Sequence, residues 1–482
     1  MAATNKNKIV EKVYTHEGGR AQGNINYKNQ LLRTVCSCLL GENTFYEDGT
    51  SIEQRIKDLV PNVKPDDVKE IAIKCRNDYK LRHVPLLITR IMAGLKSHKH
   101  LVGDTLYNVI QRVDEIPEFL AIYWKDKKQP ISAQVKKSLA KTFNKFDEYQ
   151  FAKYNRDKEI KLSDVAKLVH IKPKDKNQEL MFKKILGGFC KNCLSTHYDK
   201  IKKEKFDSYN GCNKFEELKL KTPDTWEVLI SACGSDSEKK KDVWIKLINE
   251  KKIGGMAMIR NLRNMKDVGV PFDIIKNGLL KSNYDRVLPF RFITASKYIP
   301  ELESTLEDIM LKSINKEDKL NGKTAILIDV SGSMDCKISD RSDATRMHIA
   351  SSMGILLREI CEEPYIYTFS NSCQTIPNRH GFALKDLIVN SQPHSGTRGA
   401  EATQYVFVKH GNNLDRLIII TDEQWHDHID LSSIPKNTKV YINNIGSYKN
   451  GVFYGNNKNF TRIDGFSETV IRFIQEYEKE EF

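Results

Sequence analysis

Apolar residues recur at helical spacing over the first two thirds of the chain. Leu31, Leu32, Val35 and Leu39 fall on one helix face, at positions i, i+1, i+4 and i+8. Comparable apolar stripes follow at Val68–Ile73, Val84–Leu95, Leu106–Ile116, Val135–Phe146, Leu180–Leu186, Trp226–Cys233 and Trp244–Ile248. Short polar or Gly- and Pro-containing connections separate them, without a fixed repeat length. The pattern predicts helix pairs arranged as an irregular, HEAT-like α-solenoid.

The last third of the chain has a different pattern, in which short apolar runs alternate with helical segments. The runs that predict strands are Ala325–Val330, Tyr365–Phe369, Arg416–Thr421 and Lys439–Ile445. The segments that predict helices are Ser342–Cys361, Phe382–Val389, Ala400–Val408 and Glu468–Glu478. Such alternation indicates an α/β domain with a doubly wound parallel sheet. We therefore expect a polar arm over residues 1–25, a helical domain over 26–320 and an α/β domain over 321–482.

Candidate chemistry appears where the first of these strands ends. Asp329, Ser331 and Ser333 occupy alternate positions, and Gly332 allows a sharp backbone turn between them. One carboxylate and two hydroxyls should therefore meet at the carboxyl end of the strand, where they suit a hard cation. Two other interpretations are a plain Asp-capped turn and a phosphate-binding loop ending in Gly322-Lys323-Thr324. The phosphate loop fails because its lysine would precede the strand instead of following it.

The motif Asp-x-Ser-x-Ser resembles the metal-ion-dependent adhesion site of von Willebrand factor A domains. That resemblance implies two further ligands, and the chain offers Thr397 in a Ser-Gly-Thr loop and Asp422 after the strand Arg416–Thr421. It also implies a divalent metal ion, Mg²⁺ above all, whose open position accepts the carboxylate of an acidic protein ligand. The chain departs from the family at Arg398, where an Asp usually follows the Thr.

Net charge is distributed unevenly between these two parts. Residues 323–482 carry 17 Lys and Arg against 20 Asp and Glu, so 60 and 43 fall in residues 1–322. All the excess positive charge therefore lies in the helical part, which favours a polyanionic partner such as nucleic acid. A lysine-rich solvated surface is the alternative. The sequence has no apolar run long enough to span a membrane and no secretory signal, which indicates a cytoplasmic protein with reduced cysteines.

The positive charge is concentrated in the middle of the helical part. Lys137, Lys141 and Lys145 recur every four residues on one face of a predicted amphipathic helix. A basic run with interspersed aromatic residues follows, and its candidate RNA-binding side chains are Lys153, Arg156, Lys167 and His170. A face of one charge sign favours phosphate binding, since a solvated helix usually alternates signs.

Four residues downstream have the ligand types of a zinc site: Cys190, Cys193, His197 and Cys212. A second Cys-x-x-Cys pair is missing, and cysteine is often simply a small buried residue. We therefore assign no metal to this segment.

Several motifs in the helical part resemble the TROVE domain of the Ro autoantigen family. They are Leu31-Leu32-Arg33 followed by Gly41–Tyr46, Arg76-Asn77 with Pro85-Leu86-Leu87, Ser163–Pro173, the helix Ala257–Leu262 with its Arg260-Asn261 pair, and Leu288–Phe292. The family joins this domain to a von Willebrand A domain, so the resemblance covers nearly the whole chain.

This resemblance implies a helical ring with a basic surface and a central hole. Such proteins bind small structured noncoding RNAs outside the ring and single-stranded ends of misfolded RNAs through the hole. It implies roles for Lys153, Arg156 and His170 on the outer surface, and for Arg260 and Asn261 nearer the hole. Implied partners are those RNAs and an exoribonuclease such as polynucleotide phosphorylase. We expect a monomer that acts in RNA quality control or stress-related RNA processing.

Two other functional classes remain as alternatives. An enzyme is disfavoured, because the sequence contains no nucleophile elbow, no His-Glu-x-x-His motif and no phosphate loop. A metal-dependent protein-interaction scaffold without RNA binding remains open. A steep loss of RNA affinity with rising salt would separate the RNA-binding hypothesis from the scaffold.

Overall fold

The computed structural model describes most of the chain. The described residues are 13–21, 26–36, 38, 40, 42, 44–155, 159–186, 189–190, 215–216, 220–284, 287–314, 319–340, 342–428, 434–452, 459–465 and 469–479. They form two compact units, Val60–Val228 and a second unit that combines Met1–Leu59 with Leu229–Phe482.

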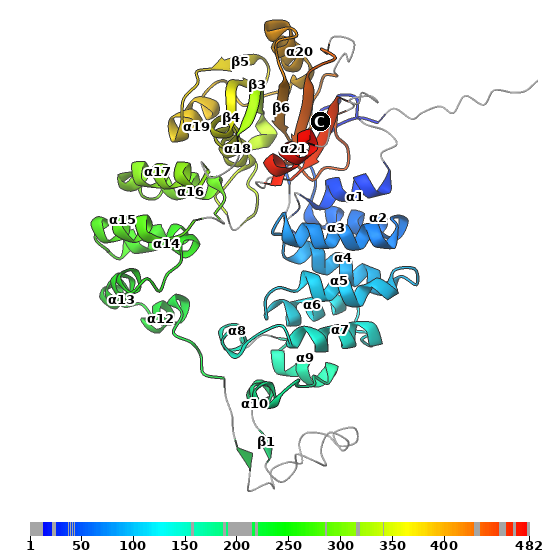
Figure 1. The fold of residues 1–482 in the computed structure, drawn as a ribbon, viewed down its shortest axis with the longest axis vertical. Helices are drawn as coiled ribbons and strands as arrows, with labels where there is room; N and C mark the ends of the chain where they lie inside the picture. The colour runs from blue at the N-terminus through cyan, green and yellow to red at the C-terminus, as the bar shows by residue number, and fades with distance from the viewer. Residues whose placement is uncertain are drawn as a thin grey trace, which may run out of the picture. The chain divides into compact units, whose positions relative to one another are not determined.

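The unit Val60–Val228 is built from helices that pack against their near neighbours in sequence (Figure 1). Its helices are η1 (Val60–Asn62), α3 (Pro65–Asn77), α4 (His83–Gly94), η2 (Lys99–Leu101), α5 (Val102–Val109), α6 (Glu115–Trp124), α7 (Ala133–Phe143), α8 (Glu148–Tyr154), α9 (Leu162–Val169) and α10 (Lys176–Ile185). The short strands β1 (Phe189–Cys190) and β2 (Phe215–Glu216) pair antiparallel, and α12 (Trp226–Ala232) follows them.

Most of these helices pack against the next helix, the one after it, or both. The contacts α3–α4, α3–α5, α4–α5, α4–α6, α5–α7 and α7–α9 show this arrangement. Such packing buries one apolar face of each helix against its successors, as the solenoid prediction requires. The predicted stripe 106–116 is divided between two helices, because α5 ends at Val109 and α6 begins at Glu115.

The same packing rule holds for the helices of the second unit that precede its sheet. They are α13 (Ser237–Asn249), α14 (Gly255–Asp267), α15 (Phe272–Lys281), α16 (Pro289–Ser296), η4 (Pro300–Leu302) and α17 (Glu303–Ile314). The N-terminal helices α1 (Tyr27–Val35) and α2 (Gly49–Leu59) belong to this unit too. Contacts of α16 and α17 with α18 (Arg346–Ile360) join the helical layer to the α/β part.

The α/β part has a six-stranded sheet in the order β5-β4-β3-β6-β7-β8. The strands are β3 (Leu320–Asp329), β4 (Cys361–Phe369), β5 (Cys373–Ile376), β6 (Arg416–Thr421), β7 (Lys439–Asn444) and β8 (Phe460–Asp464). All neighbours pair in parallel except β5, which runs antiparallel to β4. The doubly wound fold is therefore confirmed, with an antiparallel edge strand and a further strand β8 that the apolar pattern did not reveal.

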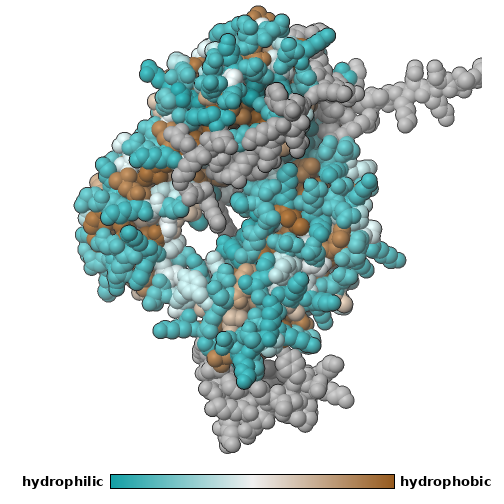
Figure 2. Space-filling model, in the orientation of Figure 1, coloured by the Kyte–Doolittle hydropathy of each residue, from teal (hydrophilic) through white to brown (hydrophobic). Residues whose placement is uncertain are grey.

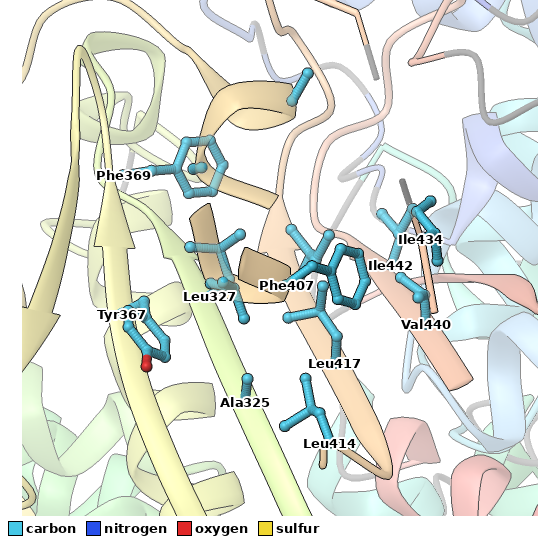
Figure 3. Packing of buried hydrophobic residues seen from close by; sticks show 14 of the residues in the cluster. Ala325, Leu327, Tyr367, Phe369, Phe407, Leu414, Leu417, Ile434, Val440 and Ile442 are labelled. Atoms are coloured by element: carbon cyan, nitrogen blue, oxygen red, sulfur yellow. The ribbon is translucent and has the colours of Figure 1, made fainter. Parts of the chain in front are cut away.

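Helices cover both faces of this sheet because alternate residues of each strand point to opposite sides. On one face, Leu327 and Leu417 pack with Phe407 of α20 (Gly399–His410), as Figure 3 shows. On the other face α18 lies so close to β3 that a Cβ at Gly354 would come within 2.6 Å of Ile328 Cδ1. Two more helices, α19 (Gly381–Val389) and α21 (Thr469–Lys479), and the short η5 (Gly332–Asp335) complete this part.

The N-terminal segment 13–21 packs against the α/β part. Ala21 forms an isolated bridge with Val452, and the Thr15 hydroxyl donates a hydrogen bond to the Trp425 carbonyl at 2.6 Å. No helix in the described part of the chain is both long and apolar enough to cross a membrane.

Candidate functional sites

The predicted metal ligands lie together at the carboxyl ends of two neighbouring strands. Asp329 ends β3 and Asp422 follows β6, its parallel neighbour. Ser331 and Ser333 continue from β3, and their hydroxyl oxygens are 3.4 Å apart. Asp329, Ser331, Ser333 and Asp422 are all buried, because strands on both sides and helices on both faces enclose this edge.

Thr397 reaches the same place through two backbone contacts. The Gly332 N–H donates to the Ser395 carbonyl at 3.0 Å, which fixes the loop before Thr397 to the loop after β3. The His426 N–H donates to the Thr397 carbonyl at 3.1 Å, which fixes it to the segment after Asp422. Thr397 is therefore held between the two acid-bearing segments, and its side chain is buried.

The hydrogen bonds of the two acids differ. Asp329 is fully engaged, since Oδ1 accepts from the Ser331 N–H at 2.9 Å and Oδ2 from the Thr421 hydroxyl at 2.6 Å. Asp422 Oδ1 accepts from the Gln424 N–H at 3.1 Å, whereas Oδ2 has no hydrogen-bond partner in the described structure. The guanidinium of Arg346 lies 3.5 Å from this oxygen, but a buried carboxylate oxygen that accepts no hydrogen bond is still costly unless a ligand occupies the site.

Burial also shifts the ionisation of both acids. It raises the pKa of Asp329 to about 7, and the nearby Asp422 carboxylate adds to the shift. Burial likewise raises the pKa of Asp422, although the guanidinium of Arg346 opposes this shift. Two adjacent buried acids with three hydroxyl-bearing side chains around them make a set of hard oxygen donors. The residues present therefore fit a hard divalent cation of the Mg²⁺ type, which all five predicted ligands would hold.

No described group of three or more His, Cys, Asp and Glu residues could hold a metal. This does not bear on the candidate site, whose donors are two acids and three hydroxyls. Cys193, His197 and Cys212 lie outside the described residues, as does the side chain of Cys190.

Two buried arginines beside Asp422 were not predicted as part of this site. Arg346, the first residue of α18, places Nη1 3.5 Å from Asp422 Oδ2 and also donates to the Tyr448 hydroxyl. Arg33 of α1 donates to the carboxylate of Glu423, the residue after Asp422, and to the Tyr448 carbonyl at 2.7 Å. The Leu31-Leu32-Arg33 motif was the only signal for the second arginine, and it carried no indication of its contact.

The predicted basic stripe lies on α7, whose N-terminus is capped by the Ser132 side chain. Lys137 and Lys141 are exposed and form no ion pair within the described structure. The Lys141 Nζ lies 4.5 Å from the centre of the Tyr107 ring. This part of the stripe therefore presents positive charge beside an aromatic ring. Figure 2 shows a mainly hydrophilic surface over this unit, with small separate apolar areas.

Lys145 differs from the other two lysines of the stripe. Its Nζ donates to the carbonyls of Tyr107 and Ile110, both at 2.7 Å, at the C-terminal end of α5. Burial lowers the pKa of this amine. The side chain caps a helix, so the geometry favours a structural role over the phosphate contact that its spacing predicted.

The remaining candidates in this unit divide by exposure. Lys153 is half-buried and lies 5.6 Å from the centre of the Tyr154 ring, and Lys167 is exposed. His170 is also exposed and ends α9 in the left-handed conformation, at φ 54°. Arg156 lies outside the described residues.

The Arg260-Asn261 pair on α14 separates into an exposed cation and a buried amide. Asn261 is buried, donates to the Ala257 carbonyl at 2.8 Å and accepts from Asn264 at 3.0 Å. Both ends of its amide are thus used inside the helix, which favours packing over RNA contact. Arg260 is exposed and lies near Arg291 of α16, whose pKa is lowered by burial and by that neighbouring charge.

The fold and the site together define a helical-repeat protein joined to a von Willebrand A-like domain. The family model for the TROVE domain matches residues 206–371, which include Arg260 and the Asp329–Ser333 loop. Telomerase protein component 1 from Mus musculus is 22% identical over 346 residues, and the protein of that name from Rattus norvegicus is 23% identical over 346 residues. Each match covers 58% of this chain and only 13% of the relative.

A solved structure is similar over nearly the whole chain. The crystal structure of the Deinococcus radiodurans Ro (RSR) protein has a TM-score of 0.59, with 14% identity over 95% of this chain and 100% of that chain. At this level of identity the likeness shows the fold. The matches to TROVE and Ro proteins confirm the family resemblance that the sequence motifs indicate.

Proposed function

We propose that this protein binds RNA through its helical part and acts as a component of a ribonucleoprotein. The observation that supports this proposal is the exposed pair Lys137 and Lys141, neither of which forms an ion pair with a described acid. Such lysines bind phosphates by releasing counterions. The TROVE match and the excess charge of residues 1–322 support the same partner class.

The bound RNA in this proposal is a small structured noncoding RNA, together with single-stranded ends of misfolded RNA. Binding is the proposed activity, without a catalytic step. Phosphate contacts would set the affinity, while RNA shape and unstacked bases would set selectivity.

A salt-dependent gel shift tests the proposal. The probe is a hairpin RNA with a single-stranded 3′ extension, titrated at several salt concentrations with the full chain and with the double variant Lys137→Glu, Lys141→Glu. We expect weaker binding and a log–log salt slope that is shallower by about 2, one unit for each lost phosphate contact.

The matched control is Lys239→Glu with Lys241→Glu on α13. These lysines already lie beside Asp236 and Glu238, and the control makes the same change in net charge. Equal weakening by the two double variants would show that only net charge matters, which contradicts a binding face on α7. An unchanged slope in both would leave the protein-only scaffold as the better hypothesis.

We also propose a second function, the binding of a divalent cation that docks an acidic protein ligand. Asp422 Oδ2, buried without a hydrogen bond, is the observation that favours it. In that function Asp329, Ser331, Ser333, Thr397 and Asp422 hold the ion, which supplies an open coordination position for the partner's carboxylate. Calorimetric titration with Mg²⁺ should show binding to the full chain and none to Asp329→Ala. Heat of equal size from both proteins would contradict the site.

A further inference from the structure

Arg346 places a fixed positive charge beside the candidate metal site. Its side chain is 7% exposed, and its Nη1 lies 3.5 Å from Asp422 Oδ2. A cation in the first turn of a helix is disfavoured by the helix dipole, and burying it costs further free energy. The compensation comes from Asp422 and from Tyr448, whose ring centre lies 4.8 Å from the guanidinium carbon.

Tyr448 also determines how Arg346 meets the acid. Nη1 donates its hydrogen bond to the Tyr448 hydroxyl, and the distance of 3.5 Å to Asp422 Oδ2 is too long for a second good hydrogen bond. The guanidinium therefore acts on Asp422 through charge while leaving the oxygen without a hydrogen bond. An arginine that hydrogen-bonded Oδ2 directly would compete with the cation for that atom.

The charge count of the site follows from these contacts. Asp329 and Asp422 contribute two negative charges and Arg346 one positive charge. Glu423 and the nearby Asp464 face Arg33 and Arg462, so these four groups balance one another when ionised. Ionised and loaded with a divalent cation, the site would carry a net charge of about +1. Without Arg346 the loaded site would be neutral, and a carboxylate would gain less by binding there.

We infer that Arg346 determines the ligand specificity of this site, because it makes the loaded site cationic and so favours an anionic carboxylate ligand at the expense of cation affinity. This inference rests on the proposed metal function. Cation and carboxylate should then bind cooperatively, and by linkage each raises the affinity of the other by the same factor.

Mg²⁺ titrations with and without acetate as the carboxylate probe test this inference on the full chain. For Arg346→Met we expect Mg²⁺ affinity to rise about tenfold or more, since a divalent ion and a unit charge a few Å apart repel by that amount even with the screening of water. The effect of acetate on Mg²⁺ affinity should shrink in the same variant. Arg346→Lys, which keeps the charge, should retain most of the acetate effect.

Tyr448→Phe gives a prediction of the opposite sign. Without the hydroxyl, Arg346 is free to hydrogen-bond Asp422 Oδ2, so Mg²⁺ should bind several-fold more weakly than to the unchanged protein. The matched control is Arg358→Met, which removes one positive charge from the last turn of the same helix and should bind Mg²⁺ as the unchanged protein does. Melting temperatures are recorded for every variant.

The outcomes separate the inference from the function on which it rests. If the unchanged protein and Asp329→Ala give the same Mg²⁺ heat, the proposed metal site is wrong. If Mg²⁺ binds and a folded Arg346→Met shows equal or lower affinity, or keeps the full acetate effect, the inference on Arg346 is wrong. Should Arg346→Met not fold, Tyr448→Phe decides: weaker Mg²⁺ binding supports the inference, and unchanged or tighter binding overturns it.

Discussion

Replacing Arg33 by Met tests whether one buried ion pair holds the loops that flank the candidate metal site. The Arg33 side chain is 1% exposed and Glu423 is fully buried. Arg33 Nε and Nη2 donate to the carbonyls of Tyr448 and Asn450, at 2.7 and 3.0 Å. Glu423 adopts a positive φ of 58°, which a non-glycine residue holds only when its surroundings impose it. One side chain thus holds two loops in place.

The size of the effect follows from what Arg33→Met leaves behind. Glu423 keeps a second partner, Arg462, whose Nε donates to Oε1 at 2.8 Å, so the carboxylate is not left entirely without compensation. The buried Tyr448 carbonyl loses a charged donor, as does the partly buried Asn450 carbonyl, which keeps its hydrogen bond from Gln424. Removal of one partner from a buried pair typically costs about 3–5 kcal/mol. Because of Arg462, we expect the lower end, about 3 kcal/mol.

Hydrogen exchange measured by mass spectrometry gives this quantity locally. Peptides that cover 421–427 and 446–452 should exchange about a hundredfold faster in Arg33→Met, since 3 kcal/mol corresponds to about two factors of ten. Peptides from α7 serve as the internal control and should be unchanged. The double variant with Glu423→Gln should recover part of the loss, because it removes the buried charge. Additive effects of the two substitutions, or unchanged exchange in both loops, would refute a coupling between Arg33 and Glu423.

Three further predictions concern single side chains. Asp329→Asn should stabilise the metal-free protein, because it removes one of two buried carboxylates that repel each other. The same substitution should abolish stabilisation by Mg²⁺. Melting curves with and without Mg²⁺ measure both effects, and stabilisation by Mg²⁺ that persists in the variant would contradict the assignment of Asp329 as a ligand. Burial and nearby lysines lower the pKa of His348 to about 4, so stability from its neutral form is fully present above pH 6.5 and is lost as pH falls toward 4. The shift corresponds to about 3 kcal/mol, which solvent screening of this half-buried side chain reduces to about 2 kcal/mol. His348→Gln should flatten the acid loss in urea titrations, and an unchanged pH profile would rule out His348 as its source. Lys145→Met should lower the free energy of unfolding of the unit Val60–Val228 by about 1–2 kcal/mol, measured by denaturant titration, because two carbonyls lose their donor. The salt slope of RNA binding should stay unchanged. A slope that is shallower by one unit would show that Lys145 contacts a phosphate.

The predicted elements that agree best with the structure are those with a long helical apolar stripe or an uninterrupted apolar run. Six successive residues of β6 are buried, and the predicted bounds Arg416–Thr421 are those of the structure. The strands β5 and β8 have mixed burial, and so they carry no apolar run that would reveal them. Edge strands are covered on fewer sides than central ones, which removes the signal on which a sequence-based prediction depends.

Side-chain roles on a predicted face were harder to infer, because spacing gives a direction and not a partner. Lys137, Lys141 and Lys145 are equivalent by their spacing, yet only Lys145 reaches the end of α5 and caps it. Arg76 and Arg260 stand in similar motifs, but Arg76 is buried against Glu115 at 2.7 Å whereas Arg260 is exposed. A motif records that a residue type is needed at a position, and only the fold shows whether it is needed for packing or for a ligand.

In the candidate metal site, the sequence likewise predicts the ligands but not the distant residues that support them. Its five ligands could be predicted because strand ends and loop motifs lie close to them in sequence. The residues that support them could not, since Arg33 and Glu423 are separated by 390 positions. The change of apolar period near residue 321 marks where strands begin, but the compact unit that contains the sheet also includes Met1–Leu59. Arg33 of α1 and Thr15 of the non-helical segment 13–21 both contact the segment that follows Asp422, so both parts of the N-terminal region help to hold the metal acids in place.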